Sequence, residues 1–495
     1  MAHVLGIDVG TSATRATLLD DDGSVVATAS GPYSSTRGTH GECEQDPEDW
    51  LLALEHALAG LPLATAPPSA VGLCGQTPTL VLVGEDGRPV RPAMTWQDVR
   101  AREEAGELAE RLGPAGPLVG TDLPWSPANM PAKLLWLSRH EPTNLARTRW
   151  LLQAKDVVVL ALTGAATSDA WSSKGICRVD TGGPATEVLE ACGWSSRACP
   201  PIGLAWDRAG EVRDDAAGRF GIASGTPVSV GWSDALAQVL AAGCYERSSA
   251  FFFSGTSAIV GAPVADERSP VPGLFSVPRS CSPSALLYGP TQSSGAALAW
   301  VADLLGLDPG GLADLALGAA GEPPAFVPYL SGERAPWWDE GLRAAFLGVG
   351  SEHGRPELAR SVLEGVFFSA RHLLSLVAGP SGERAPRVEV VGRGVGDRAW
   401  EMLAAGALGA TLAFHGDPDL SARGAAMLGA AAAGEALSSV GGRLGAPVRT
   451  VVPREDDVAR GDAAFARYLD AVEVSRGWRS RPAARTGRVE RGTGP

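Results

Sequence analysis

The sequence of 495 residues has almost no lysine. Its three lysines are Lys133, Lys155 and Lys174; arginines greatly outnumber them, and none of the three follows a glycine. A Gly-Lys-Ser/Thr phosphate-binding loop is therefore excluded, so any nucleotide must be held in another way. The chain also lacks a Gly-x-Gly-x-x-Gly segment opening a helix after the first strand, which disfavours a dinucleotide-binding fold.

Long apolar runs and a basic surface are missing as well. No stretch of eighteen or more residues is apolar enough to span a bilayer, and Asp8 and Arg15 interrupt the amino terminus before a signal-peptide core can form. We therefore expect a cytoplasmic protein. The net charge of −14 argues against the basic field that nucleic acids or anionic membranes require, so neither is expected as a partner.

The cysteines are not arranged for zinc or for disulfides. They are seven in number, scattered, and form no Cys-x-x-Cys pair, so we expect reduced thiols and no structural zinc. A chain of this length with 45% hydrophobic residues can bury more than one core. Two large domains are the expected organisation.

The tripeptide Gly-Thr-Ser is present twice, at Gly10-Thr11-Ser12 and Gly255-Thr256-Ser257, each time after a short apolar run. The copies are separated by about half of the chain, which predicts two duplicated α/β lobes facing one another across a cleft. Such a turn offers backbone N–H groups and hydroxyls to an anion, so each copy is a candidate phosphate cradle. The alternative is two unrelated glycine turns.

The two copies differ in one acidic residue. Asp8 lies inside the apolar strand before the first copy, whereas Phe251-Phe252-Phe253 before the second copy contains no acid. A carboxylate is costly to bury there without a partner, so Asp8 is a candidate for holding Mg²⁺ against phosphates. Asp8 could instead be a turn residue that accepts hydrogen bonds from backbone amides.

Asp234 is the candidate general base. It ends an apolar strand and precedes a helix, a position where α/β proteins bring side chains to a ligand crevice. A carboxylate there could take the proton from a hydroxyl that attacks the γ-phosphate of ATP, or could merely cap the helix that begins at Ala235. Arg15 is either a phosphate contact or a surface charge. The glycines in 392–396 could let a flat base lie against the backbone.

Periodicity predicts most of the elements around these motifs. A hairpin is expected over 4–9 and 14–20, continuing to a third strand at 24–30, and a second hairpin is expected between 80–83 and 89–96. Helices are predicted near 47–58, 98–112, 131–140, 235–242, 294–305 and 356–378, and buried strands at 71–75, 228–231 and 388–391. The turn at Gly225-Thr226-Pro227 marks the expected crossing into the second lobe.

Several segments resemble the FGGY carbohydrate kinase family, in the family's order from about residue 4 to 470. They are Gly6-Ile7-Asp8-Val9-Gly10-Thr11-Ser12, Trp96-Gln97-Asp98-Val99-Arg100, Lys133-Leu134-Leu135-Trp136-Leu137 with His140-Glu141-Pro142, Lys155-Asp156 with Leu162-Thr163-Gly164, Tyr329-Leu330-Ser331-Gly332-Glu333-Arg334-Ala335-Pro336, and Ala422-Arg423-Gly424-Ala425-Ala426. The segment at 329–336 is especially similar to xylulokinases. The resemblance implies an α/β fold of two RNase H-like lobes of the actin-type ATPase kind around a central cleft.

The resemblance also implies ATP-dependent phosphorylation of a sugar or polyol hydroxyl, with Mg²⁺. With the boundary at the turn near residue 226, residues 1–226 are the expected sugar-binding lobe and 227–475 the expected nucleotide-binding lobe. Residues 476–495 hold six arginines and one acid with little apolar content, which predicts a disordered tail. The residues that match family positions are the catalytic base Asp234, the metal-positioning Asp8, the phosphate-turn residues Thr11, Ser12 and Thr256, and the nucleotide-site residues Gly295, Gly392 and Gly394.

On the acceptor side, Gln76, Thr77, Trp96 and Asp234 are the expected substrate-binding residues. Xylulokinases usually have Gln-Met-His-Gly, and glycerol kinases Gln-Arg-Glu, where this chain has Gln76-Thr77-Pro78-Thr79; Trp232 and Ala235 also depart from the family pattern. Such a pocket should favour a less hydroxylated or differently shaped acceptor. A ketopentose is the first candidate, glycerol or another polyol the second, and a non-catalytic sugar-responsive regulator the third. A homodimer is the candidate assembly.

Overall fold

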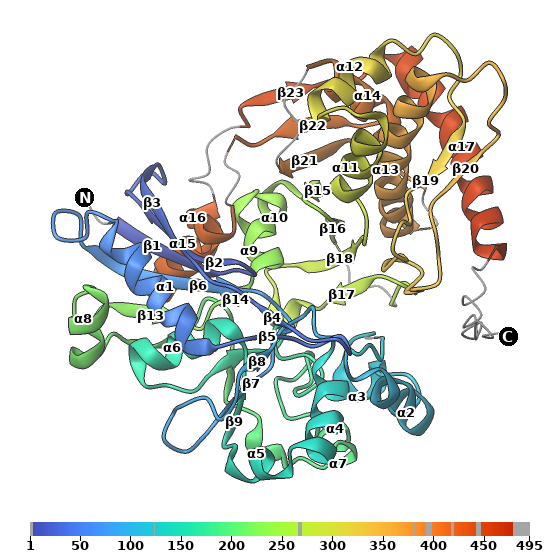
Figure 1. Cartoon of the computed structure of the whole chain (residues 1–495). Coiled ribbons are helices and arrows are strands. Elements are labelled where there is room, and N and C mark those ends of the chain that lie inside the picture. Colours follow the sequence, from blue (N-terminus) through green and yellow to red (C-terminus); the bar gives the residue numbers. More distant parts are fainter. Residues whose placement is uncertain are drawn as a thin grey trace, which may run out of the picture. The chain divides into compact units, whose positions relative to one another are not determined.

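The computed structural model describes residues 3–122, 124–265, 270–379, 382–392, 398–416, 420–441 and 447–478. The chain divides into two compact units (Figure 1). The first unit consists of Met1–Ser249, Ala262–Leu287 and Asp417–Pro447, and the second of Ala250–Gly261, Tyr288–Gly416 and Val448–Pro495. Each unit contains strands of a mixed seven-stranded sheet with helices packed on it, which confirms the predicted α/β class.

The first sheet belongs to the first unit. Its strands follow the order β12 (Arg208–Glu211), β13 (Pro227–Ser229), β6 (Pro68–Gly75), β1 (His3–Val9), β2 (Ala13–Leu19) and β3 (Val25–Pro32), and β14 (Trp232–Ser233) also pairs with β6. Strand β6 is parallel to β1, and β13 and β14 are each parallel to β6. Strand β2 is antiparallel to β1. The apolar residues of β1 and β6 are buried, as the sequence pattern predicts for a central strand pair.

The second sheet repeats this plan. Its order is β17 (Phe275–Val277), β18 (Ala285–Pro290), β16 (Ala258–Val264), β15 (Ala250–Ser254), β21 (Arg387–Gly392), β22 (Thr411–Phe414) and β23 (Arg449–Val451). As β1 does with β2 and β6, β15 pairs with an antiparallel β16 and a parallel β21. A parallel strand and then an antiparallel edge strand follow on that side of both sheets. The duplication inferred from the Gly-Thr-Ser repeat is confirmed.

Helices and short strands complete the two units. Those of the first unit are α1 (Pro47–Ala59), α2 (Arg102–Leu112), α3 (Gly116–Val119), α4 (Met130–His140), α5 (Pro142–Arg147), α6 (Ala154–Thr163), α7 (Thr186–Ala191), α8 (Asp214–Phe220), α9 (Asp234–Ala241), α10 (Cys244–Arg247), α15 (Leu420–Ala432), α16 (Leu437–Gly441), β4 (Thr36–Arg37), β5 (Cys43–Gln45), β7 (Val81–Val83), β8 (Ala93–Met94), β9 (Trp150–Leu152), β10 (Ser168–Asp169) and β11 (Ile202–Gly203). Those of the second are α11 (Gly295–Leu305), α12 (Pro309–Leu317), α13 (Arg355–Ala378), α14 (Arg398–Leu408), α17 (Glu455–Gly477), β19 (Ala325–Val327) and β20 (Ala345–Leu347).

Helix α15 joins the first unit because its backbone lies directly against the central strands (Figure 1). A Cβ on Gly6 would lie 1.8 Å from the carbonyl oxygen of Ala422, and one on Gly72 would lie 1.7 Å from that of Ala425. On the other face of the helix, a Cβ on Gly424 would lie 2.0 Å from the carbonyl oxygen of Ala237 in α9. Glycine at these positions allows the close approach of helix and sheet.

The observed division differs from the boundary expected near residue 226. Strands β13 and β14 pair with β6, so residues 227–249, including Asp234, belong to the first unit. The segments Ala262–Leu287 and Asp417–Pro447 also return to it. Of the tail expected to be disordered, residues 476 and 477 end α17, and 479–495 lie outside the described residues.

One helix departs from the expectation that no segment could span a membrane. By length and composition, α13 is apolar enough, with a mean hydropathy of 1.3 over eighteen residues. Most of that window, 72%, is buried in the structure, and α13 packs against α12, α14 and β19. A buried core helix of a folded unit satisfies the same test, so we interpret α13 as the core helix of the second unit.

Candidate active site

The two predicted acids lie at one edge of the first sheet. In the strand register, Asp8 of β1 faces Cys74 of β6, and Cys74 faces Trp232 of β14. These three strands run parallel, so Asp234, which follows β14 directly, emerges at the same carboxyl edge as Asp8. With β6 between them, strand spacing separates their backbones by roughly 10 Å. The carboxyl edge of parallel strands is where α/β proteins bind ligands.

Asp234 is the first residue of α9, but it is not the helix cap. Ser233 occupies the N-cap position, and its hydroxyl oxygen accepts a hydrogen bond from the Leu236 N–H. The carboxylate of Asp234 accepts a hydrogen bond from the Ala235 N–H at 2.7 Å. The capping function that was the alternative for Asp234 is thus already supplied by Ser233, which leaves the acid available for chemistry.

Burial raises the pKa of Asp234 to about 6. The Ala235 N–H and the positive charges of Lys174 and Arg15 oppose this rise, because each favours the ionised carboxylate. A carboxylate with a pKa near 6 is ionised at neutral pH and remains basic enough to accept a proton from a hydroxyl in a transition state. The electrostatics of the site therefore suit a general base.

Asp8 is buried, at 2% exposure, and lies beside the guanidinium group of Arg15. The Arg15 Nη1 atom lies 3.4 Å from its Oδ2, and the Cys74 thiol donates to its Oδ1 at 3.5 Å. No group of three or more His, Cys, Asp or Glu able to hold a metal ion is found in the part of the chain that the structure describes. A single carboxylate fits Mg²⁺ because this ion is commonly held by one or two carboxylates together with substrate phosphates and water.

The first Gly-Thr-Ser turn is held by a network of side chains. Its backbone accepts hydrogen bonds from the Tyr33 hydroxyl, at the Gly10 oxygen, and from the Gln45 amide, at the Thr11 oxygen. The Thr11 hydroxyl accepts a hydrogen bond from the indole N–H of Trp96 at 3.1 Å. A predicted phosphate-turn residue and a predicted acceptor-binding residue are therefore in direct contact.

Gln76 belongs to the same network. Its amide donates to the Gln45 Oε1 at 2.8 Å, and its own Oε1 is buried without a hydrogen-bond donor among the described residues. Thr77 follows it, half-buried, while Ser12 is exposed and accepts the Tyr33 N–H through its carbonyl oxygen. Each of these predicted residues lies at the carboxyl end of β1 or β6.

Trp232, expected to reshape the acceptor pocket, is fully buried. Its ring packs edge-on against Trp206, with centroids 6.1 Å apart, and stacks on Tyr245 at 6.3 Å. Trp232 therefore belongs to a buried aromatic cluster and does not offer an exposed surface to an acceptor.

The second unit gathers three of the predicted nucleotide residues around its own Gly-Thr-Ser turn. The Gly295 N–H donates to the Gly255 oxygen at 2.9 Å, and the Ser294 N–H donates to the Thr256 oxygen at 3.1 Å, so α11 begins on the turn. Gly392 ends the neighbouring β21 with a φ of +143°, and a Cβ there would lie 2.1 Å from the Ser254 oxygen. Gly394, the remaining predicted residue, lies outside the described residues.

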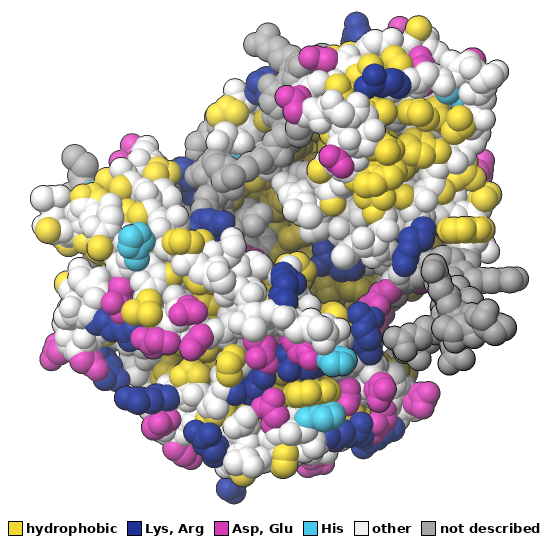
Figure 2. All heavy atoms as spheres, in the orientation of Figure 1, with side chains coloured by type: hydrophobic (Ala, Val, Ile, Leu, Met, Phe, Trp, Pro, Cys, Tyr) yellow, Lys and Arg dark blue, Asp and Glu magenta, His cyan; other side chains and the backbone are white. Residues whose placement is uncertain are grey.

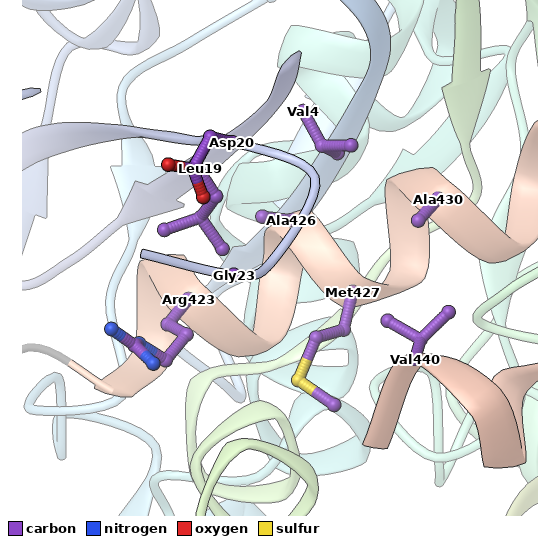
Figure 3. Close-up of a pocket in the computed structure, with 9 residues that line it drawn as sticks. All are labelled: Val4, Leu19, Asp20, Gly23, Arg423, Ala426, Met427, Ala430 and Val440. Atoms are coloured by element: carbon purple, nitrogen blue, oxygen red, sulfur yellow. The ribbon is translucent and has the colours of Figure 1, made fainter. Parts of the chain in front are cut away.

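A small pocket in the first unit lies away from the carboxyl edge (Figure 3). Figure 3 shows its lining residues coming from β1, β2 and the turn after β2 on one side and from α15 and α16 on the other. Val4 is near the amino end of β1, and the turn at Asp20–Gly23 follows β2, so the pocket lies at the end of the sheet opposite to Asp8. It is not part of the candidate active site.

Comparison with known proteins identifies the family. The model of the FGGY family of carbohydrate kinases, N-terminal domain, matches residues 3–241, and that of the C-terminal domain matches residues 250–433. The chain belongs to the FGGY family of carbohydrate kinases. The predictions of the family, the fold class and a phosphotransferase with an alcohol group as acceptor are confirmed by these matches.

Individual relatives agree with the family assignment. The chain is 30% identical to a xylulose kinase of Escherichia coli (strain K12), covering 87% of this chain and 90% of that protein. It is 29% identical to a xylulose kinase of Streptomyces rubiginosus, covering 92% and 94%. Among solved structures, a xyloylose kinase from Brucella ovis matches with a TM-score of 0.88 and 28% identity over 96% of this chain and 99% of the other.

Sequence reasoning missed several residues of the carboxyl edge. Gln45 and Tyr33 support the first turn, and Lys174 is close enough to Asp234 to lower its pKa. Gln45 is the last residue of the short β5 and Tyr33 directly follows β3, and neither segment carries a motif. The only signal for Lys174 is that lysine is so rare in this chain.

We predict that Gly295→Ala weakens ATP binding. The added methyl group would lie 2.5 Å from the Gly255 oxygen, so the turn or the start of α11 must move. The KM for ATP is expected to rise more than tenfold in steady-state assays, with the KM for the acceptor unchanged. Gly106→Ala in α2, where a Cβ has open space, is the matched control. An unchanged ATP KM in Gly295→Ala would contradict the assignment of this turn to the nucleotide.

Proposed function

We propose that this chain transfers the γ-phosphate of ATP to a hydroxyl of a ketopentose, as a xylulokinase-like enzyme. The observation that carries the proposal is the common sheet edge that brings Asp8 and Asp234 together beside the Thr11–Trp96 contact. The two xylulose kinases described above match this chain over most of their length, which supports a ketopentose as acceptor.

Asp234 is the base in this proposal. Its ionised carboxylate accepts the proton of the acceptor hydroxyl as the hydroxyl oxygen attacks phosphorus and the β–γ bridging bond of ATP breaks. Asp8 would hold Mg²⁺, which supplies charge neutralisation to the phosphates when bound. The turn at Gly10–Ser12 would bind phosphate oxygens. In the second unit, Thr256, Gly295 and Gly392 would bind the nucleotide, and Gly394, which lies outside the described residues, is proposed for the same function. Gln76, Thr77 and Trp96 would orient the acceptor.

A panel of acceptors tests the proposal. ADP release is measured with xylulose, ribulose, two pentitols and glycerol, each at several concentrations with ATP and Mg²⁺. The highest kcat/KM is expected for a ketopentose. A preference for glycerol or a pentitol would show that the acceptor is a polyol and not a ketopentose. The absence of ADP release with every compound would favour the non-catalytic regulator.

The expected partners and location are part of the same proposal. A sugar kinase needs a small-molecule acceptor, and we propose a cytoplasmic homodimer with no nucleic-acid or membrane partner. On the face shown in Figure 2, acidic and basic side chains are interspersed over the part that carries the first unit, without a basic field. This mixture agrees with the net charge of −14 and gives no support to a polyanion-binding surface on that face.

A further inference from the structure

Among the described residues, the ammonium group of Lys174 has fewer hydrogen-bond acceptors than that of either other lysine of this chain. The side chain of Lys133 donates to the carbonyl oxygens of Pro78, Met94 and Thr95, and that of Lys155 contacts two carboxylates and a carbonyl. Lys174 is 5% exposed, yet its Nζ donates a single hydrogen bond, to the Trp171 oxygen at 3.1 Å. Two of its N–H groups have no acceptor among the described residues.

The ammonium group is held between aromatic rings. Nζ lies 4.9 Å from the ring centroid of Trp171 and 5.8 Å from that of Phe275. These contacts favour a cation but accept none of its hydrogen bonds in the usual N–H···O manner. Burial lowers the pKa of Lys174 to about 8, so it is mostly charged at neutral pH. A buried charged donor with open positions is costly unless a ligand fills them.

Lys174 also acts on the proposed base. Its charge lowers the pKa of Asp234, and the charge of Asp234 raises the pKa of Lys174. The other groups that act on Lys174 are Asp169, Cys177 and Cys281. The carboxylate of Asp169 is already bound, to the Lys155 ammonium at 3.0 Å and to the Ser172 N–H at 2.9 Å. The open N–H positions of Lys174 are therefore left for a group that enters the site of Asp234.

We propose that Lys174 is an acceptor-binding residue whose free N–H groups donate to an oxygen of the sugar that Asp234 deprotonates. The inference rests on the proposed function, since it needs an acceptor at Asp234. A carbonyl or hydroxyl oxygen of a ketopentose would accept these hydrogen bonds. A carboxylate oxygen of a sugar acid would accept the same hydrogen bonds and would also carry a negative charge. The test below distinguishes a ketopentose from a sugar acid as the bound ligand.

The test compares Lys174→Met with the parent protein. Methionine keeps much of the side-chain length but has no charge and no N–H donors. Xylulose binding is measured by calorimetry without ATP, and the KM values for xylulose and ATP are measured separately. Loss of a charge-assisted hydrogen bond should raise the Kd and KM for the acceptor about tenfold to a hundredfold, with the ATP KM unchanged. Xylonate is titrated in parallel; tighter binding of xylonate that Lys174→Met abolishes would identify the carboxylate as the bound oxygen.

Two further variants keep the test decisive. Arg178→Met removes a half-exposed positive charge from the same segment, where Arg178 pairs with Asp180, and should leave the acceptor Kd unchanged. Lys174→Arg keeps the charge and donors, and is expected to bind the acceptor more tightly than Lys174→Met; circular dichroism and thermal unfolding check that both are folded. Equal affinities in the Arg and Met variants would overturn the inference.

The outcomes also separate this inference from the proposed function. If the parent phosphorylates xylulose but Lys174→Met binds it with the same Kd, the function stands and the inference is overturned. If Lys174→Met only moves the acidic limb of the pH profile of kcat/KM to higher pH, with Kd and KM unchanged, Lys174 acts only by changing the pKa of Asp234. The inference that it binds the acceptor is then overturned as well. A parent that binds neither xylulose nor xylonate, with or without ADP present, overturns both.

Discussion

Replacing Asp234 with asparagine is expected to lower kcat at pH 7.5 by roughly 10²–10⁴-fold, because the acceptor hydroxyl loses its general base. The local fold should survive, since Ser233 caps α9 and an asparagine oxygen can still accept the Ala235 N–H. ATP binding, measured by calorimetry, is expected to match that of the parent. A kcat within threefold of the parent would remove Asp234 from the reaction.

Asp214→Asn is the matched control for this experiment. Asp214 is likewise the first residue of a helix in the first unit, α8, but lies on the surface and bonds Ser224. Its kcat should equal that of the parent. A loss of activity in both variants would show that the effect belongs to helix starts in general and not to the carboxyl edge of the sheet.

The pH dependence of the parent follows from the same group. The pKa of Asp234 is raised to about 6, so the base is protonated and inactive below that pH and ionised above it. The kcat/KM for the acceptor is therefore expected to rise with pH through about 6 and to level off near neutrality. The residual activity of Asp234→Asn should lack this acidic limb. A parent profile that is flat between pH 5 and 7 would contradict the assignment.

Replacing Lys155 with methionine is expected to cost about 3–5 kcal/mol of unfolding free energy, because the change leaves buried carboxylates without their cation. The Lys155 ammonium, fully buried, lies 2.6 Å from the Asp156 Oδ1 and 3.0 Å from the Asp169 Oδ1, and it donates to the Val230 oxygen at 3.1 Å. It thereby connects α6 and β10 to the segment that leads into β14. Urea unfolding of the parent and the variant measures the difference.

Arg208→Met serves as the control for Lys155→Met. Arg208 pairs with Glu211 on the surface, where a salt bridge is worth at most about 1 kcal/mol.

The pH dependence of the stability deficit in Lys155→Met gives a second check. Burial already raises the pKa of Asp156 in the parent, and loss of Lys155 should raise it further. A carboxyl whose pKa is higher in the folded state than in the unfolded state destabilises the fold increasingly as pH rises. The deficit of the variant should therefore shrink as the pH is lowered toward the ordinary aspartate value of 3.8. A deficit under 1 kcal/mol at pH 7 would contradict the structural role.

Local pattern was sufficient to predict many elements of this fold. The helices at α1, α4 and α11 and the strands β1 and β21 lie within a few residues of their predicted bounds because their apolar spacing is set by adjacent residues. The hairpin expected over 80–83 and 89–96 is not the main pairing. Strand β7 pairs instead with β9, about seventy residues away, and only isolated bridges join the expected partners. Such long-range partners leave no local signal.

The two acids of the site could be predicted because parallel strands end at the same edge of a sheet. Asp8 was identified as an acid inside an apolar strand and Asp234 as an acid at the end of one, and the parallel register of β1, β6 and β14 then places them at one edge. The supporting residues Gln45 and Tyr33, and the open ammonium group of Lys174, come from segments without a motif. Their proximity depends on how loops pack, which periodicity does not encode.

The glycine contacts of α15 have a consequence for synthesis of the chain on the ribosome. The helix that covers β1 and β6 is made from residues 420–432, so these first strands are translated hundreds of residues before their covering helix. A nascent chain that has emerged only to residue 249 carries the amino-terminal sheet with one apolar face uncovered. We expect such truncated chains to aggregate or recruit chaperones until the later segment is available.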